Sequence, residues 1–141
     1  MNETWLSYIR EKFTDTPFFR FMGVDIDTLE KGFARLSLEI KPDLLNTYGT
    51  CHGGALAALV DMSMGIGLRT LMVKVVTVEL SMNYLQPAYP GEKIVAEAKA
   101  IYEGRRVIVA EANLIGREGL IAKGKGTFLV TGPDSIEESS D

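Results

Sequence analysis

Two groups near the middle of the chain have the types and spacing to act on a polarised bond. One is the turn His52-Gly53-Gly54, which opens a long apolar segment, and the other is Asp61, the only acid in residues 44–78. The first turn of a helix offers unpaired N–H groups and a positive dipole end, which stabilise an oxyanion. A carboxylate in an apolar helix is costly unless it is paired. Taken singly, the two features also fit a plain glycine turn and a partly exposed or interface-paired aspartate.

The two groups lie too far apart on one helix to serve the same substrate. Gly53 and Asp61 are eight residues apart, which is roughly 12 Å along a helix. A reacting carbonyl needs both groups within ~3 Å. Two antiparallel copies of the helix, paired about Ala57 and Ala58, would bring Gly53 of one copy opposite Asp61 of the other. If the pair is catalytic, we expect an isologous homodimer with two sites at its interface.

Strands on both sides of this segment are expected to hold it. Ala, Leu and Met dominate residues 54–72, which predicts a helix that is buried on most sides. Residues 33–40 alternate between apolar and polar, which is typical of a strand with one solvated face. The other expected elements are a helix at 3–13 and strands at 24–30, 75–85, 93–102, 106–115 and 120–130, with 93–102 and 106–115 forming a hairpin around Gly104.

This order predicts one α+β domain in which a mostly antiparallel sheet of five to six strands wraps around one long central helix. Residues 1–22 are expected to form a helix and an apolar clasp, in which Phe18, Phe19, Phe21 and Met22 pack into the core. The main domain is expected to span 23–131. Residues 132–141 are acidic and poor in apolar residues, which predicts a disordered tail.

Composition excludes several classes of function. A net charge of −4 gives no electrostatic case for nucleic acid or an anionic membrane as the main partner. No uncharged apolar stretch reaches the ~20 residues that span a bilayer, and the N-terminus does not read as a secretory signal. One cysteine and one histidine exclude Cys-rich and His-rich metal sites, and a free thiol fits a reducing compartment. We therefore expect a cytoplasmic protein without a metal.

The pattern N-x-x-G-x-x-H-G-G, which starts at Asn46 and is followed by Asp61, resembles the hotdog-fold acyl-CoA thioesterases of the phenylacetic acid degradation type. The resemblance covers about residues 17–131. It implies that Asp61 is the general base or nucleophile and that the Gly53 amide polarises the thioester carbonyl. It also implies that Asn46 and His52 order the loop, the water or the thioester, and that Thr77 assists. Dimers of this family often pair into dimers of dimers.

The resemblance further implies where CoA, as part of the substrate and not as a separate cofactor, would be held. The matching positions are Gly54, Tyr84, Pro87, Ala88, Arg105 and Arg106. Arginine guanidinium groups suit phosphates, although a solvated hairpin tip explains either arginine alone equally well. Lys123 and Lys125 share a strand face and could add positive charge, but a plain solvated face explains them better.

Two other functions remain open on the same fold, because a fold alone does not decide activity. A hotdog enoyl-CoA hydratase or dehydratase would pair an acid with a catalytic histidine, and Asp61 has no second histidine to work with. A non-catalytic acyl-CoA-binding sensor would usually carry a DNA-binding segment, for which residues 1–22 are too short and too acidic. The sequence does not identify the acyl group.

Overall fold

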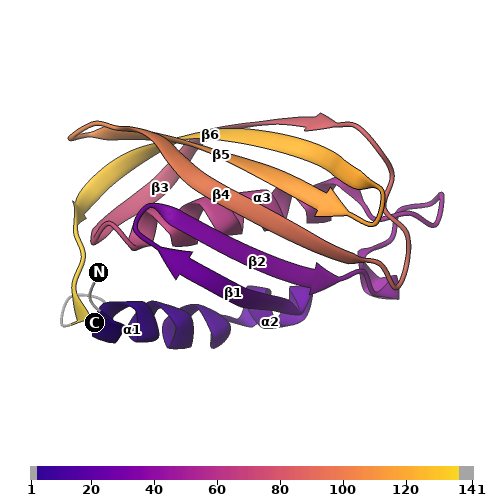
Figure 1. The fold of residues 1–141 in the computed structure, drawn as a ribbon, viewed down its shortest axis with the longest axis horizontal. Helices are drawn as coiled ribbons and strands as arrows, with labels where there is room; N and C mark the ends of the chain where they lie inside the picture. The colour runs from indigo at the N-terminus through magenta and orange to yellow at the C-terminus, as the bar shows by residue number, and fades with distance from the viewer. Residues whose placement is uncertain (1–2, 137–141) are drawn as a thin grey trace.

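The computed structural model describes residues 3–136, which form three α-helices and six strands (Figure 1). The elements are α1 (Glu3–Thr14), α2 (Pro17–Met22), β1 (Val24–Glu30), β2 (Phe33–Glu39), a 3₁₀ turn (Pro42–Leu44), α3 (Gly53–Arg69), β3 (Val73–Tyr84), β4 (Lys93–Glu103), β5 (Val107–Gly116) and β6 (Gly119–Pro133). Every predicted helix and strand has a counterpart among them.

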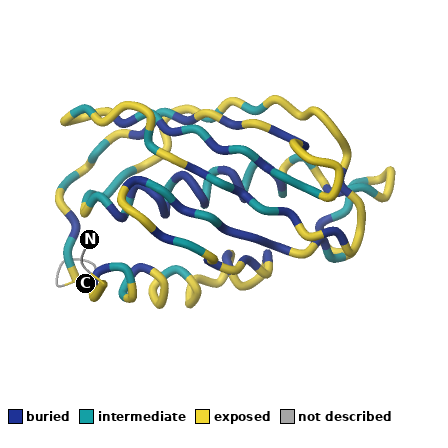
Figure 2. Tube along the Cα trace, viewed as in Figure 1, coloured by how far each residue is buried: buried dark blue, intermediate teal, exposed yellow. Residues whose placement is uncertain are grey.

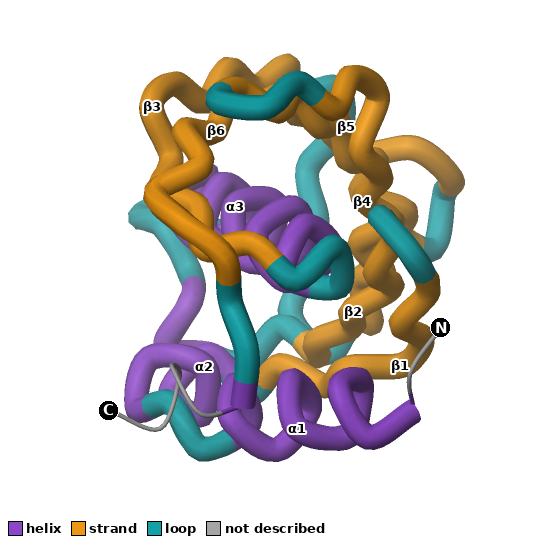
Figure 3. The backbone as a smooth tube through the Cα atoms, turned by 90° about the vertical axis from the view of Figure 1, so that its left-hand side faces the viewer, coloured by secondary structure: helices purple, strands orange, loops and turns teal. Residues whose placement is uncertain are grey.

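The six strands form one antiparallel sheet in the order β1-β2-β4-β5-β6-β3. Seen end-on, the sheet curls around α3, while α1 and α2 lie beneath it (Figure 3). This arrangement confirms the predicted hotdog architecture. The sheet ends at β1 on one side and at β3 on the other, so the strand that follows α3 is an edge strand.

The core lies between α3 and the inner face of the sheet, where the trace in Figure 2 is mostly buried. Leu59, Val60 and Leu68 of α3 are fully buried. The helix ends at Arg69 and not at the predicted residue 72. Its end is set by Thr70, whose hydroxyl donates to the Gly67 carbonyl oxygen (2.6 Å) and accepts from the Gly32 N–H (2.7 Å).

Glycines on α3 and β6 let the helix and the sheet approach each other closely, because they carry no side chain. A Cβ at Gly67 would lie 3.3 Å from the Ala34 backbone nitrogen. On β6, a Cβ at Gly124 would lie 2.5 Å from Cγ1 of Val60, and one at Gly126 would lie 2.8 Å from Cε of Met64. Because interiors are close-packed, Gly67 and Gly124 set the distance at which α3 sits inside the sheet, whereas the flexible end of Met64 can give way at Gly126.

The apolar side of β2 is as predicted, since Ala34, Leu36 and Leu38 are buried. Ser37 differs from the prediction, because it is 1% exposed although it alternates with the buried set. Its hydroxyl donates to Oδ1 of Asp27 on β1, which satisfies it away from water (3.1 Å). The outer face of β2 is therefore not uniformly solvated.

Both ends of the described chain differ in detail from the predicted boundaries. The expected clasp is the short helix α2, which buries Phe19 and Met22 but leaves Phe18 (54%) and Phe21 (52%) exposed. β6 continues past residue 131 to Pro133, and Asp134 is buried. Residues 137–141 of the predicted disordered tail lie outside the described residues, as do residues 1 and 2. Within residues 3–136, no helix has the length and apolarity needed to cross a membrane.

Glu92 ties two loops together at the end of the sheet that lies near the start of α3. Its buried carboxylate accepts hydrogen bonds from the backbone N–H groups of Tyr89 (3.0 Å) and Arg117 (2.6 Å). The Tyr89 bond, helped by the bond to Arg117 and its charge, lowers the pKa of Glu92 below its usual value, although burial opposes the shift.

We expect Glu92→Gln to lower the free energy of unfolding by about 1–3 kcal/mol at neutral pH, because the amide presents an NH₂ group to one of two N–H donors. The folded-state pKa of Glu92 is lowered, so its contribution is present above the unfolded-state pKa and is lost as the pH falls through the folded-state pKa. The difference between the variant and the parent should therefore shrink in acid. Urea unfolding at neutral and acidic pH measures this, with exposed Glu118→Gln as the control. A difference that stays constant or grows in acid would contradict this assignment.

Candidate active site

The loop before α3 is shaped by Asn46, whose side-chain amide is fully engaged within the loop. Its Oδ1 accepts hydrogen bonds from the N–H groups of Tyr48 (2.9 Å) and Thr50 (3.1 Å), and its Nδ2 donates to Oγ1 of Thr50 (2.8 Å). Gly49 adopts a φ of 83°, which favours glycine. Of the roles that the resemblance implied for Asn46, ordering the loop is the one that these contacts support.

His52 is the N-cap of α3, and its ring engages one of the helix's free amides. Nδ1 accepts a hydrogen bond from the Gly54 N–H (2.8 Å), so in the neutral ring the proton is on Nε2. The N–H groups of Ala55 and Leu56 donate to the His52 carbonyl oxygen. The Gly53 N–H finds no acceptor within residues 3–136. The cap therefore leaves Gly53 as the amide available to a ligand.

Tyr84, at the end of β3, lies against the same turn. Its hydroxyl donates to the Gly53 carbonyl oxygen (2.8 Å), and its ring carbon Cζ lies 3.4 Å from where a Cβ on Gly53 would be. The turn and this strand end bound a pocket of about 330 Å³, lined by Cys51, Gly53, Leu56, Tyr84, Leu85, Gln86 and Pro87. Tyr84 and Pro87, both predicted to bind CoA, thus lie beside Gly53.

Asp61, in the middle of α3, and Thr77, on β3, are in direct contact. The Thr77 hydroxyl donates to Oδ1 of Asp61 (2.8 Å), which joins α3 to the edge strand β3. Asp61 is half-buried and lines a different pocket, of about 310 Å³. No residue lines both this pocket and the one beside Gly53. The acid and the amide therefore belong to separate hollows of one chain, in agreement with the spacing argument.

The two arginines predicted to bind phosphates lie far from Tyr84. They occupy the turn between β4 and β5, where the Val130 N–H donates to the Arg106 carbonyl oxygen. Val130 pairs with Val75 at one end of β3, whereas Tyr84 ends the strand nine residues later, which is roughly 30 Å at 3.3 Å per residue. A single chain therefore does not bring Arg105 and Arg106 to the predicted CoA-binding residues around Gly53.

The remaining candidate residues, Ala88 and Lys123, contact other residues of the same chain. Ala88 is fully buried, and its carbonyl oxygen accepts a hydrogen bond from the Cys51 N–H (2.8 Å), so it supports the loop from beneath. Lys123 donates to Oδ1 of Asn113 (3.1 Å) and pairs with Glu111 (3.7 Å) on the outer face of the sheet. In residues 3–136, no group of three or more Cys, His, Asp or Glu side chains could hold a metal ion.

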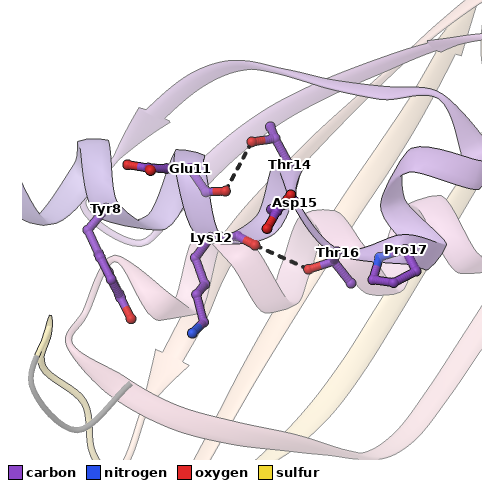
Figure 4. Close-up of a pocket in the computed structure, with 7 residues that line it drawn as sticks. All are labelled: Tyr8, Glu11, Lys12, Thr14, Asp15, Thr16 and Pro17. Atoms are coloured by element: carbon purple, nitrogen blue, oxygen red, sulfur yellow. Dashed lines mark hydrogen bonds between the residues drawn. The ribbon is translucent and has the colours of Figure 1, made fainter. Parts of the chain in front are cut away.

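A more voluminous hollow, of about 700 Å³, is bounded by α1 and the turn to α2 (Figure 4). Its lining residues are Tyr8, Glu11, Lys12, Thr14, Asp15, Thr16 and Pro17, and none of them is a candidate site residue. The hydroxyls of Thr14 and Thr16 donate to the carbonyl oxygens of Glu11 and Lys12. These hydroxyls serve the end of the helix, and nothing in this hollow resembles an acid–amide pair.

Sequence reasoning missed two residues near Asp61, because both come from distant parts of the chain. Phe13 of α1 and Phe128 of β6 line the pocket that contains Asp61. Both are apolar, as in any core, and no spacing rule connects them to an acid on α3. Likewise, no sequence pattern predicts the hydrogen bond from the Tyr84 hydroxyl to the Gly53 carbonyl oxygen.

Comparisons with known proteins identify the family of this chain. The family described as the thioesterase superfamily matches residues 48–122. A Saccharolobus solfataricus protein named as a candidate esterase is 34% identical over 89% of this chain and 85% of its own. The acyl-coenzyme A thioesterase PaaI of Escherichia coli K12 is 24% identical, over 69% of each chain.

One solved structure of a similar protein contains a ligand. It is a hypothetical thioesterase of Streptococcus pneumoniae with coenzyme A, which is 28% identical over 82% of this chain and 94% of its own, with a TM-score of 0.79. Two variants of that protein, in which an aspartate or a threonine 16 positions further on is replaced by alanine, have TM-scores of 0.77 at 26% identity over 79% of this chain and 93% of theirs.

Cys51 should be unreactive in the folded protein. Burial raises the pKa of its thiol from the usual 9.0 to about 11, which lowers the thiolate fraction at neutral pH about 100-fold. We expect an alkylating reagent at neutral pH to modify the native protein at least about 100-fold more slowly than the urea-unfolded protein. Mass spectrometry over time measures both rates, and equal rates would refute the burial of this thiol.

Proposed function

The chain belongs to the thioesterase superfamily, and we propose that it hydrolyses an acyl-CoA thioester to the free acid and CoA. In this proposal Asp61 is the general base or nucleophile, and the Gly53 amide polarises the carbonyl. The observation that carries it is the helix start itself. The His52 ring caps Gly54 and leaves the Gly53 N–H available, while Asp61 follows on the same helix with its carboxylate held by Thr77.

These groups can perform the reaction without a further cofactor. Water attacks the carbonyl carbon, and Asp61 takes the proton from that water. The Gly53 N–H, at the positive end of α3, stabilises the negative charge that develops on the carbonyl oxygen. The carbon–sulfur bond then breaks and CoA leaves as a thiolate. In the nucleophilic alternative, the Asp61 carboxylate attacks the carbonyl carbon, the carbon–sulfur bond breaks with loss of the CoA thiolate, and water then hydrolyses the resulting anhydride to the free acid and the Asp61 carboxylate.

A second copy of the chain would complete the site. Asp61 and Gly53 line different pockets, and the face of α3 that carries Asp61, Ala57 and Ala58 is only half-buried. Beside it, the edge strand β3 exposes Val76 (50%) and Val78 (63%). Unpaired edge strands and exposed apolar faces are surfaces at which other protein chains bind. We propose an isologous homodimer across this surface, in which each site takes Asp61 from one chain and Gly53 from the other.

The relatives support the assignment of Asp61 and Thr77. The aspartate and the threonine replaced in the pneumococcal variants are 16 positions apart, the same separation as Asp61 and Thr77. That protein also binds coenzyme A. In an antiparallel dimer, the β4–β5 turn of one chain would lie toward the Tyr84 end of its partner. Arg105 and Arg106 could then join Tyr84 and Pro87 around one CoA, which a single chain does not permit.

Asp61→Asn tests the acid. We expect kcat for acyl-CoA hydrolysis to fall about 10²–10⁴-fold, the range for losing a positioned acid or base, with KM little changed. The asparagine carbonyl oxygen can still accept the Thr77 hydroxyl bond, so the thermal midpoint should stay near that of the parent. Thiol release across a panel of acyl-CoAs measures the effect. Near-normal turnover, or hydration of an enoyl-CoA without thiol release by the parent, would contradict the proposal.

Gly53→Pro tests the amide, because proline has no N–H. Position 53 is the first residue of α3, where proline is favoured, and the preceding His52 has φ −61° and ψ 136°, which proline tolerates in its neighbour. Gly53→Ala is the matched control, since it adds a Cβ but keeps the N–H. We expect the proline variant to lose about 10²–10³-fold in kcat and the alanine variant to keep most of it.

Mixing the two inactive variants tests the shared site. A dimer of one Asp61→Asn chain and one Gly53→Pro chain contains one intact site and one doubly damaged site. After subunit exchange of equal amounts, about a quarter of the parental activity should return, because half of the dimers are mixed. If both groups acted within one chain, mixing would restore nothing.

A further inference from the structure

One side of the pocket beside Asp61 is formed by a helix that lies outside the residues matched to the family. The thioesterase superfamily match begins at residue 48, yet Phe13, on α1, lines this pocket together with Met62, Ile66 and Val75. α1 lies beneath α3 in the end-on view (Figure 3). An element outside the matched region therefore helps to define the space next to the candidate acid.

The pocket follows α3 away from Asp61. Gly65 lies one turn further along the helix and Arg69 a second turn further, and both line the pocket. A Cβ on Gly65 would meet no atom within 4 Å, so the space above this glycine is open. The eight residues from Asp61 to Arg69 span roughly 12 Å. The hollow is thus a short apolar trough with the acid at one end.

Phe13 and Arg69 close the other end. The Arg69 guanidinium lies 5.3 Å from the centre of the Phe13 ring and forms an ion pair with the buried Asp134. The Trp5 indole N–H donates to the Arg69 carbonyl oxygen (2.9 Å), which fixes α1 against the end of α3. Asp134 neutralises the guanidinium. The Phe13 ring is therefore the side chain at this end that an apolar part of a ligand would contact.

We propose that Phe13 closes the acyl-binding pocket and sets the longest acyl chain that the protein accepts. This inference rests on the proposed hydrolysis of acyl-CoA. With the thioester carbonyl beside Asp61, an extended acyl chain runs along α3 over Gly65 toward Phe13. With C–C bonds of ~1.5 Å, such a chain advances roughly 1.25 Å per carbon. The trough therefore takes acyl groups of up to about eight to ten carbons, and its volume of about 310 Å³ lies at the small end of ligand pockets.

The test compares chain-length profiles of kcat/KM for saturated acyl-CoAs from four to sixteen carbons. Phe13→Ala should move the optimum to chains about two to four carbons longer and raise the preference for twelve over eight carbons at least about tenfold, since each added methylene gains a contact. Phe13→Leu, which keeps an apolar contact to α3, should move the optimum in the same direction by less. Phe13→Trp should move it to shorter chains.

Phe18→Ala is the matched control, because Phe18 is an exposed phenylalanine on α2 that does not line the pocket. Its profile should coincide with that of the parent. Profiles of folded Phe13→Ala and Phe13→Leu that also coincide with the parental one would overturn this inference and leave the proposed function intact. If the parent releases no thiol at any chain length, the proposed function fails and this inference fails with it.

Discussion

The fixed distance along α3 between its first amide and its one carboxylate is the constraint on which the rest of the structure depends. A helix is rigid over two turns, so Gly53 and Asp61 keep their separation whatever the loops around them do. Each group opens into its own pocket. The sheet holds the helix on its buried sides and leaves only half-buried the face that carries Asp61, next to the edge strand β3. The candidate site is therefore open on the side where the proposed second chain would lie.

Elements with a strong periodic pattern were predictable from the sequence. The alternation in residues 33–40 identified β2, and the mostly apolar character of residues 54–72 identified a buried central helix. The order of elements then favoured a sheet wrapped around that helix, which the structure confirms. Within the candidate site, the contact between Thr77 and Asp61 was predictable only through the resemblance, because it joins residues on different elements.

The rest depends on contacts that no local pattern encodes. Ser37 reads as a solvated residue, but the neighbouring strand supplies Asp27 as its partner. The end of α3 is set by Thr70, whose hydroxyl reaches a backbone amide 38 residues earlier. Asp134 belongs to an acidic stretch that resembles a tail, but Arg69 offers it a buried partner. In each case a tertiary contact overrides the local signal, as expected when packing outweighs propensity.

Gly124 makes the position of α3 depend on a residue that is remote from any substrate. Gly124 and Gly126 each face a helix side chain at a distance that leaves no room for a methyl group. A larger residue at Gly124 would press on the β-branched Val60 and push α3 outward, and Asp61 and Gly53 would move with it, whereas at Gly126 the flexible end of Met64 can turn aside. Variation at position 124 could therefore shift the candidate site in a lineage while every residue of that site stayed the same.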